Sequence, residues 1–325
     1  MKIKLATFNL YQFAKPPYSW YTKKEKFTEQ QWIEKTTWIK NQIIKMDCDI
    51  IGFQEVFSKD ALESLVKELG FDYFETVDVA KLNKTTYIST TVAIASKYPI
   101  TKLQKVKAHI PSFKKHYFKG NFSFARVPIK ATIMLPNEIE LLVYVAHLKS
   151  NRLNEFEYIF NKTHDLNHKK DTVSKALQGT SATSLQQRLC EASSLFFDIK
   201  KSKKIPTVLL CDFNDKEFSL TIDALSNTKY HYPKSRAKLL LHDASYHYKE
   251  VVDNPHPEAK EPQRKATSYF LGKGNVLDYI FISKQFNVTN YTVLDEHLHE
   301  HGVDLLLKSD HAQVVCELSF KEETK

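Results

Sequence analysis

Residues 207–215 read TVLLCDFND, a short apolar run that leads into Asp212 and Asn214. Short runs rich in valine, isoleucine and leucine are typical of buried strands. Because side chains alternate along a strand, Phe213 is expected to point into the core while Asp212 and Asn214 project the same way. The aspartate could take a proton from water, and the asparagine could hold that water or a phosphoryl oxygen. Taken alone, these residues fit an ordinary turn better.

The same arrangement recurs along the chain, because other apolar runs also carry a polar residue at one end. In three of them the polar residue comes at or near the carboxyl end, and in two it comes at the start. Strands running in opposite directions would bring both kinds of end to one edge of a mixed sheet, so a single pocket could gather all of these side chains. The segments are LATFNL (Asn9), DIIGFQEVF (Glu55), VYVAHLKS (His147), VLDYIFIS (Asp278) and SDHAQVVCEL (Asp310 and His311).

Two of these positions have chemical meaning by themselves. Glu55 ends an apolar strand, and a carboxylate beside a core needs a partner, which could be a metal ion or the ammonium of a lysine. Asp278 could hold and charge His311, because a carboxylate partner raises the pKa of an imidazole and fixes its orientation. Lone Asp-His pairs are frequent in loops, so the set carries more weight than any member.

Composition bounds the class of protein. The chain has 325 residues, a net charge of +9 and only seven glycines, and it contains no glycine-rich phosphate loop. A basic surface favours polyanions such as nucleic acid or an anionic membrane, although general lysine usage would give the same charge. Because the candidate residues run from Asn9 to His311, we expect one domain over 1–325.

The chain gives no sign of a targeting or membrane segment. Its first residues, MKIKLATFNL, run directly into a strand and lack the apolar stretch of a signal peptide. No run approaches the ~18 apolar residues of a membrane helix. The four cysteines lie in apolar runs and are expected to be free thiols, so we expect a cytoplasmic protein, although a trimmed secreted chain would look the same.

Apolar periodicity predicts helices over 29–46, 59–69 and 184–200. A polar segment at about 151–183 lacks a sustained apolar period and is expected to be an inserted, mobile loop. A second irregular stretch, 243–265, contains three prolines. Strands are expected over 3–10, 49–55, 71–77, 85–96, 122–135, 139–148, 205–213, 267–271, 276–283, 288–294 and 312–320.

In order and in neighbours, TFNL, DIIGFQEVF, VAHLKS, LLCDFND, LDYIF and SDH resemble the motifs of the endonuclease/exonuclease/phosphatase superfamily. This superfamily includes the pancreatic deoxyribonucleases and the bacterial sphingomyelinases. The resemblance spans nearly the whole chain and implies an α/β fold, a four-layer sandwich of two mixed β-sheets packed face to face with helices on both outer faces. It also implies hydrolysis of phosphoesters with a divalent cation.

The resemblance also implies roles for the motif residues. Glu55 would be the principal metal ligand, with Asn9 and Asp310 close by. An oxygen-only ligand set suits Mg²⁺ or Mn²⁺ and not zinc. Asp212 would activate or orient the attacking water, helped by Asn214.

The remaining implied roles concern the phosphoryl group. His311, paired with Asp278, would stabilise that group in the transition state, and His147 would contact phosphate or assist the leaving group. Arg126 matches an arginine that follows a Phe-Ser pair in several members, and it would contact phosphate or else lie on a surface strand.

Three further features lie near these motifs. Lys149, just past His147, is expected near the rim of the site, where it would touch substrate. Arg188 could cover the pocket, but a solvated position on its helix is the favoured interpretation. The histidines of DEHLHEHG (295–302) are expected in a solvated loop. The alternative is that these histidines bind a metal ion.

The leading hypothesis is therefore a metal-dependent phosphodiesterase or nuclease that acts on nucleic acid. A hydrolase of small phosphoesters, such as an inositol or sugar phosphate or a phospholipid headgroup like that of sphingomyelin, fits the motifs equally well. A non-enzymatic scaffold that binds anions is disfavoured, because no expected catalytic position is replaced. No protein partner is evident from the sequence.

Overall fold

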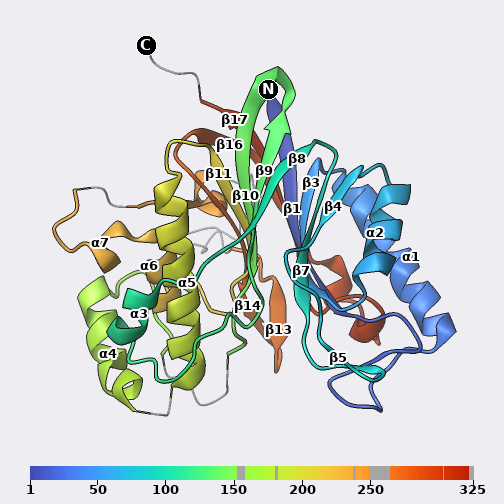
Figure 1. The fold of residues 1–325 in the computed structure, drawn as a ribbon, viewed down its shortest axis with the longest axis horizontal. Coiled ribbons are helices and arrows are strands. Elements are labelled where there is room, and N and C mark those ends of the chain that lie inside the picture. Colours follow the sequence, from blue (N-terminus) through green and yellow to red (C-terminus); the bar gives the residue numbers. More distant parts are fainter. Residues whose placement is uncertain (152–157, 180–181, 237–238, 249–263, 303, 322–325) are drawn as a thin grey trace, which may run out of the picture.

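The computed structural model describes residues 1–151, 158–179, 182–236, 239–248, 264–302 and 304–321. In this part of the chain, two six-stranded mixed β-sheets pack face to face, and helices cover both outer faces (Figure 1). The four-layer α/β sandwich expected from the sequence is thus confirmed.

The first sheet is centred on β1 (Lys2–Phe13) and has the strand order β16-β17-β1-β3-β7-β4. β1 runs parallel to β3 and antiparallel to β17, so the carboxyl ends of β1 and β3 meet the start of β17 at one edge. The other strands are β3 (Ile50–Val56), β4 (Tyr73–Glu75), β7 (Thr91–Ser96), β16 (Phe286–Leu294) and β17 (Gln313–Phe320).

The second sheet has the order β12-β15-β11-β10-β9-β8. Its β10 and β11 are parallel, and β15 runs antiparallel to β11, so the start of β15 lies beside the ends of the other two. The strands are β8 (Ile100–Lys105), β9 (Ile129–Leu135), β10 (Ile139–His147), β11 (Thr207–Asp212), β12 (His242–Asp243) and β15 (Asp278–Ile282).

Smaller elements flank the two sheets. A three-stranded sheet consists of β2 (Ser19–Trp20), β6 (Thr86–Tyr87) and β5 (Leu82–Asn83), and a hairpin consists of β13 (Ser268–Phe270) and β14 (Lys273–Asn275). The short 3-10 turns are η1 (Pro136–Glu138), η3 (Ala244–His247), η4 (Glu296–Leu298) and η5 (Leu305–Leu307).

The helices divide between the two outer faces (Figure 1). The first sheet is covered by α1 (Glu29–Met46) and α2 (Lys59–Glu68), and the second by α3 (Ile110–Lys115), α4 (Leu166–Gln178), α5 (Thr183–Lys201), α6 (Leu220–Ser226) and α7 (Thr228–His231). Within the described residues, none of these helices has both the length and the apolar character that crossing a membrane requires.

Local sequence signals explain the predicted bounds of α1. The Thr28 side chain accepts the backbone N–H of Gln31, and the Gln31 side chain accepts the backbone N–H of Thr28, which is the reciprocal cap of a helix start. Asp47 ends the helix with a φ of 46°. One buried face of α1 then packs on the first sheet through Ile39 and Ile43.

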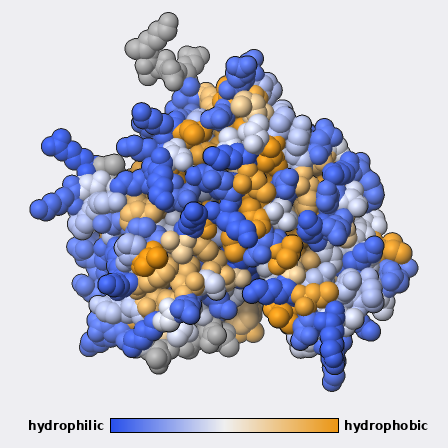
Figure 2. Space-filling view, viewed as in Figure 1, coloured by the Kyte–Doolittle hydropathy of each residue, from blue (hydrophilic) through white to orange (hydrophobic). Residues whose placement is uncertain are grey.

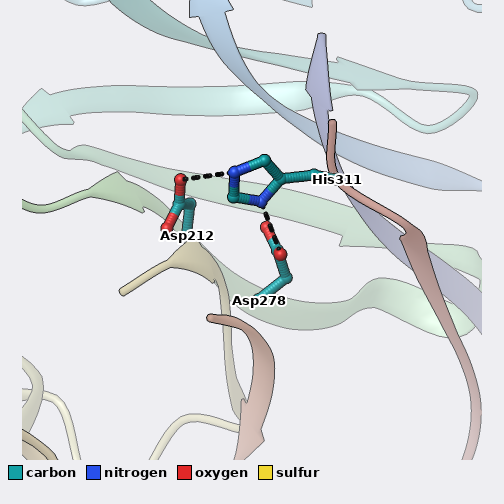
Figure 3. A group of neighbouring side chains, drawn as sticks. All are labelled: Asp212, Asp278 and His311. Carbon is teal, nitrogen blue, oxygen red and sulfur yellow. Dashed lines mark hydrogen bonds and ion pairs between the residues drawn. The ribbon is translucent and has the colours of Figure 1, made fainter. Parts of the chain in front are cut away.

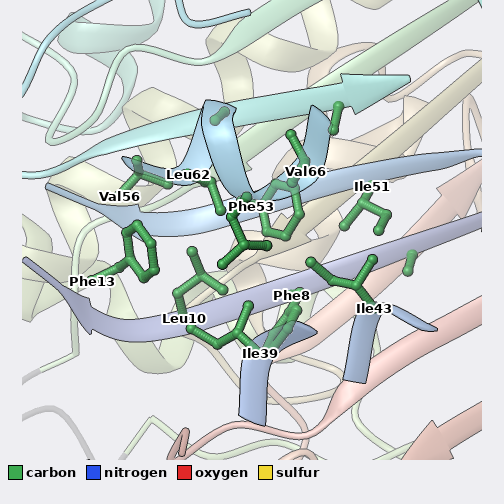
Figure 4. Packing of buried hydrophobic residues seen from close by; sticks show 14 of the residues in the cluster. Phe8, Leu10, Phe13, Ile39, Ile43, Ile51, Phe53, Val56, Leu62 and Val66 are labelled. Atoms are coloured by element: carbon green, nitrogen blue, oxygen red, sulfur yellow. The ribbon is translucent and has the colours of Figure 1, made fainter. Parts of the chain in front are cut away.

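The apolar residues form three layers of core between the four layers of structure. Figure 4 shows the layer between α1, α2 and the first sheet, where Phe8, Phe53 and Leu62 pack together. A second layer joins the two sheets, and a third lies under α4, α5 and α6. At Gly52 of β3 the two sheets are tightly packed, because an added Cβ would lie 2.9 Å from Cβ of Leu210 and 3.1 Å from Cγ1 of Val145.

The structure corrects the expectations for two segments. The polar segment expected to be a loop contains α4 at Leu166–Gln178, because Asp165 caps the helix start and Val173 and Leu177 give it a short apolar stripe. Residues 152–157 and 180–181 of that segment lie outside the described residues. The strand expected from residue 122 begins only at Ile129, since 121–128 forms an irregular aromatic segment.

His297, expected in a solvated loop, is buried. Its ring packs on Trp38 with the centroids 4.9 Å apart, and its Nε2 lies 3.2 Å from the backbone oxygen of His311. The proline-rich stretch at 249–263 lies outside the described residues.

Candidate active site

Strand pairing gathers the polar strand ends, as the sequence predicted. His147, Asp212 and Asp278 are register partners across β10, β11 and β15 of the second sheet. From the first sheet, β1 supplies Asn9, and the residues before β17 supply His311. The edges of two sheets therefore contribute to one site.

Asp212 is the centre of the hydrogen-bond network. Its Oδ2 accepts a hydrogen bond of 2.9 Å from Nδ2 of Asn9, and its Oδ1 accepts one of 2.9 Å from the backbone nitrogen of Asn214. Nε2 of His147 lies 3.3 Å from Oδ2. Burial raises the pKa of Asp212 to about 7, while the nearby charge of His311 acts to lower it. Near neutral pH this carboxylate can therefore exchange a proton with a bound water.

His311 stands between two carboxylates (Figure 3). Its Nδ1 donates a hydrogen bond of 2.7 Å to Oδ2 of Asp278, and its Nε2 lies 4.0 Å from Oδ2 of Asp212. Burial acts to lower the pKa of His311, but the charge of Asp278, followed by those of Asp212 and Asp310, raises it well above the ordinary value. His311 is therefore an imidazolium cation at neutral pH.

The two histidines differ in charge. Burial and then the nearby charges of Arg126 and His311 hold the pKa of His147 well below its ordinary value. His147 is consequently neutral, and its Nδ1 has no hydrogen-bond partner among the described residues. The site thus holds a neutral and a charged imidazole on either side of Asp212.

Glu55 and Asp310 form a second, oxygen-rich part of the site. The backbone nitrogen of Gln12 donates a hydrogen bond of 2.9 Å to Oε2 of Glu55, and Oδ1 of Asp310 is shielded from water with no hydrogen-bond partner in the described chain. Burial, and then the charge of Asp310, raises the pKa of Glu55. Half-buried carboxylates that repel each other fit a hard divalent cation.

The cluster Asp212, Asp278 and His311 also has the spacing of metal ligands. Within it, Nδ1 of His311 donates to Asp278 and Oδ2 of Asp212 accepts from Asn9, so these side chains already bind one another or a neighbour. We interpret this cluster as a hydrogen-bonded acid-base group. Glu55 and Asp310 are the residues that fit a metal ion, and the amide oxygen of Asn9, which accepts the backbone N–H of Tyr11 at 3.0 Å, keeps a second lone pair for it.

The phosphate-contact candidates lie at the rim. A guanidinium nitrogen of Arg126 donates to the backbone oxygen of Leu148 at 3.0 Å, and Nδ2 of Asn214 donates to the same oxygen at 3.1 Å. The charge of Arg126 acts to lower the pKa of Glu55, against the larger effect of burial, which raises it. Lys149 instead lines a neighbouring cavity.

Glu191 of α5 holds this rim in place and was not singled out by the sequence. Its buried carboxylate accepts the backbone N–H of Ala125 at 2.7 Å and that of Lys149 at 2.8 Å. Burial raises its pKa. Its neighbours on the same helix face include Gln187, Arg188 and Ser194, so no sequence signal marked it. Arg188, expected on a solvated face, is buried with its Nε 3.1 Å from Oδ2 of Asp215.

Two other unpredicted residues support the segment that carries Asp310. The buried ammonium of Lys35 donates to the backbone oxygens of Leu306 at 2.8 Å and Lys308 at 2.9 Å, and burial lowers its pKa to about 7. The hydroxyl of Ser309 donates to the backbone oxygen of Asn9 at 2.7 Å and accepts the backbone N–H of His311 at 3.0 Å. These contacts tie α1 and β1 to the start of β17.

A site of this kind on a four-layer sandwich defines a phosphoester hydrolase of the deoxyribonuclease I-like class. The chain belongs to the Endonuclease/Exonuclease/phosphatase family, whose profile matches residues 6–311. Enzymes of this family generally depend on divalent metal ions, and the chain is a hydrolase of the phosphoesterase and nuclease type.

Solved structures share the fold. The human Nocturnin catalytic domain, solved with bound sulfate, is 18% identical with a TM-score of 0.60, and the match covers 98% of this chain and 94% of that one. TDP2 from D. rerio, complexed with a single-strand DNA product, is 10% identical with a TM-score of 0.55 over 98% and 99% of the two chains. A family protein from Bacteroides thetaiotaomicron is 15% identical with a TM-score of 0.54 over 99% of each. A comparison with curated protein sequences gives no match.

Proposed function

We propose that this protein is a phosphodiesterase that cleaves nucleic acid and uses Mg²⁺ or Mn²⁺. The observation that carries the proposal is the pairing of Asp212 with the His311 cation, together with the half-buried carboxylates Glu55 and Asp310. This arrangement offers an acceptor for the proton of water, a fixed cation for a phosphoryl group and an oxygen-lined place for a metal ion.

The attacking group is a water molecule held by Asp212. As the water oxygen forms its bond to phosphorus, the bond from phosphorus to the leaving oxygen breaks, and Asp212 takes the proton of the water. Asn9 and the backbone N–H of Asn214 fix the two oxygens of this carboxylate, so its orientation is set before substrate arrives.

The histidines act on the phosphoryl group. His311 presents a positive charge to the negative charge that develops on the phosphoryl oxygens, and Asp278 keeps that imidazole charged and oriented. His147, which is neutral and has a ring nitrogen without a partner among the described residues, contacts the phosphate or assists the leaving oxygen.

Glu55 and Asp310 would hold the metal ion, with Asn9 as a further oxygen ligand. Oxygen donors alone favour Mg²⁺ or Mn²⁺ over zinc. When bound, such an ion polarises the phosphoryl oxygens and offsets the charge on the leaving oxygen. Arg126 and Lys149 would contact the substrate phosphates at the rim.

Nucleic acid as the substrate is supported by charge and by one structural relative. The net charge of +9 favours a polyanion. The TDP2 structure from D. rerio, which shares the fold, was solved with a single-strand DNA product. Small phosphoesters offer fewer charges to such a surface.

The test is a substrate screen with the purified chain in Mg²⁺, in Mn²⁺ and in EDTA. The panel contains single-stranded DNA, duplex DNA, RNA, bis-p-nitrophenyl phosphate, an inositol phosphate, a sugar phosphate and sphingomyelin. We expect cleavage of at least one polynucleotide that stops in EDTA and returns with Mg²⁺ or Mn²⁺. Cleavage of small phosphoesters alone would refute the substrate, and cleavage that ignores EDTA would refute the metal.

A further inference from the structure

A cavity of 560 Å³ lies beside the rim of the candidate active site. We call it the aromatic–basic pocket and define it by six lining residues: Lys81, Tyr117, Phe118, Lys119, Phe124 and Lys149. Lys81 precedes β5, on the side of the first sheet, whereas Lys149 follows β10 of the second. The pocket therefore spans both halves of the sandwich, and its volume suits a group of the size of a nucleotide.

Aromatic side chains dominate one wall. Tyr117 is 46% exposed, and Phe118 behind it packs on Phe122 with the ring centroids 5.5 Å apart. Phe122 in turn packs on Phe113 at 4.5 Å and on Phe124 at 5.2 Å. Figure 2 shows apolar surface on the lower left of the molecule, over the region where Figure 1 draws α3 and α5. These half-buried rings form a cluster beside the pocket, and the exposed ring of Tyr117 lines the pocket itself, where a flat ring can stack on it.

The pocket is also positively charged. Lys81 and Lys119 are exposed, and neither ammonium forms an ion pair with a carboxylate of the described chain. No aspartate or glutamate lines the pocket among the described residues. The larger cavity of 690 Å³ beside α1 and α2 differs, since Asp60 and Glu68 stand in its wall. Only the aromatic–basic pocket, of these two, complements an anion and a flat ring together.

Backbone connections link the pocket to the chemistry. Ala125 lines the pocket and precedes Arg126, and Lys149 lies two residues after His147. Glu191 holds the backbones of Ala125 and Lys149 together. A substrate with its scissile phosphate at His147 therefore has an adjacent unit at the mouth of the pocket.

We propose that the aromatic–basic pocket binds a nucleotide of single-stranded nucleic acid next to the scissile phosphate, which extends the proposed function. Its base stacks on Tyr117, and Lys81 and Lys119 pair with the flanking phosphates. A base can stack on a protein ring only when it is free of its own duplex, so the pocket selects single strands.

The test measures binding without turnover. Fluorescence anisotropy of a labelled deoxythymidine oligomer, with EDTA present, gives the Kd for the wild-type chain and for two variants. Tyr117→Asn suits a backbone φ of 56°, which asparagine tolerates, and Lys119→Gln changes an exposed side chain. Tyr232→Ala, at a tyrosine 40% exposed on α7's side of the molecule, is the matched control. Thermal unfolding confirms that each variant folds.

We expect Tyr117→Asn to raise the Kd for the oligomer by at least about five-fold, the scale of one lost stacking contact. Lys119→Gln should reduce the salt dependence of log Kd by about one phosphate contact. The ratio of kcat/KM for the oligomer to that for bis-p-nitrophenyl phosphate should fall in both variants and stay unchanged in Tyr232→Ala.

Unchanged oligomer affinity in the folded Tyr117→Asn variant would overturn the proposal, as would an equal loss of affinity for a duplex of the same length. Failure of the proposed function is distinguishable. A wild-type chain that binds the oligomer through Tyr117 but cleaves no polynucleotide would refute the nuclease while supporting the pocket. A chain that cleaves the oligomer with the same kinetics in both variants would refute the pocket alone.

Discussion

The carboxylate of Glu191 lies 2.8 Å from the backbone nitrogen of Lys149 and is completely buried. Its other oxygen accepts the backbone N–H of Ala125, the residue before Arg126. A helix on the outer layer of the sandwich thus fixes the backbone on both sides of the rim. Both oxygens of Glu191 accept backbone N–H groups, so we assign it a positioning role.

Glu191→Gln should disturb the rim more than the chemistry. The glutamine Nε2 would face a backbone N–H, so one donor would lose its acceptor, at a loss of stability of about 1–3 kcal/mol. We expect KM for an oligonucleotide to rise by more than kcat falls, and chemical denaturation to show the lost stability. Glu75→Gln, at an exposed glutamate, is the control. A fall in kcat alone would contradict a positioning role.

Asp212→Asn should reduce kcat by at least about 100-fold, because the amide cannot accept the proton of water. The variant should still fold, at a loss of about 1–3 kcal/mol, because its amide oxygen can replace only one of the two acceptors that serve Asn9 and the backbone of Asn214. Initial rates with the most active substrate of the screen give the measurement, beside Asp72→Asn as an exposed control. Turnover of Asp212→Asn within ten-fold of wild type would remove Asp212 from its proposed role.

Metal binding should be visible without activity. A divalent ion that binds only the folded chain stabilises it by about 2.7 kcal/mol at 100 times its Kd, so Mg²⁺ or Mn²⁺ should raise the Tm. Glu55→Gln should abolish that increase. Without metal, the same variant should be at least as stable as wild type, because the repulsion between Glu55 and Asp310 is relieved. A metal-induced rise in Tm that persists in Glu55→Gln would show that the ion binds elsewhere.

Stability should fall in mild acid because of buried neutral histidines. Burial, and then the charges of Lys115 and His231, lowers the pKa of His116 from 6.5 to about 3, so the unfolded chain binds a proton between these values that the folded chain does not. The free energy of unfolding therefore decreases as the pH falls below 6.5. Between about pH 7.5 and about pH 5, this one histidine should account for about 2 kcal/mol.

His116→Gln removes the titrating ring and leaves a polar side chain near the hydroxyl of Tyr230, which lies 2.8 Å from Nε2 of His116. Urea denaturation at the two pH values should show a smaller loss of stability for this variant than for wild type. His301→Gln, at an exposed histidine, should keep the wild-type loss. Equal losses in all three chains would mean that His116 titrates alike in the folded and unfolded states.

The sequence predicts which strand ends lie together at the candidate site, because strand ends are local signals. Asp212 and His147 each close an apolar run, and a parallel pair of such strands places their ends together. Asp278 comes at the start of β15. Because β15 runs antiparallel to β11, this start lies beside the end of β11, and Asp278 pairs in register with Asp212. The directions of these strands and their order along the chain were sufficient to predict that these residues lie together.

The sequence fails where burial depends on distant elements. Glu191 and Lys35 look like solvated helix residues, yet each is buried with backbone groups of segments far away along the chain. His297 looks like part of a charged loop, but Trp38 of α1 covers it. The apolar stripe of α4 consists of only two residues, Val173 and Leu177. The polar composition of the segment therefore gave no clear helical pattern, although packing against its neighbours stabilises the helix.

Gly52 lies at a tight contact between the two sheets, and each sheet carries some of the candidate site residues. A methyl group there would push Leu210 and Val145 away and separate the sheets. The distance between the candidate residues of one sheet and those of the other therefore depends on a glycine in the middle of the protein. Substitutions intended to change the substrate are therefore safer at the rim than in the central layer, where one added carbon would move the candidate residues of one sheet relative to those of the other.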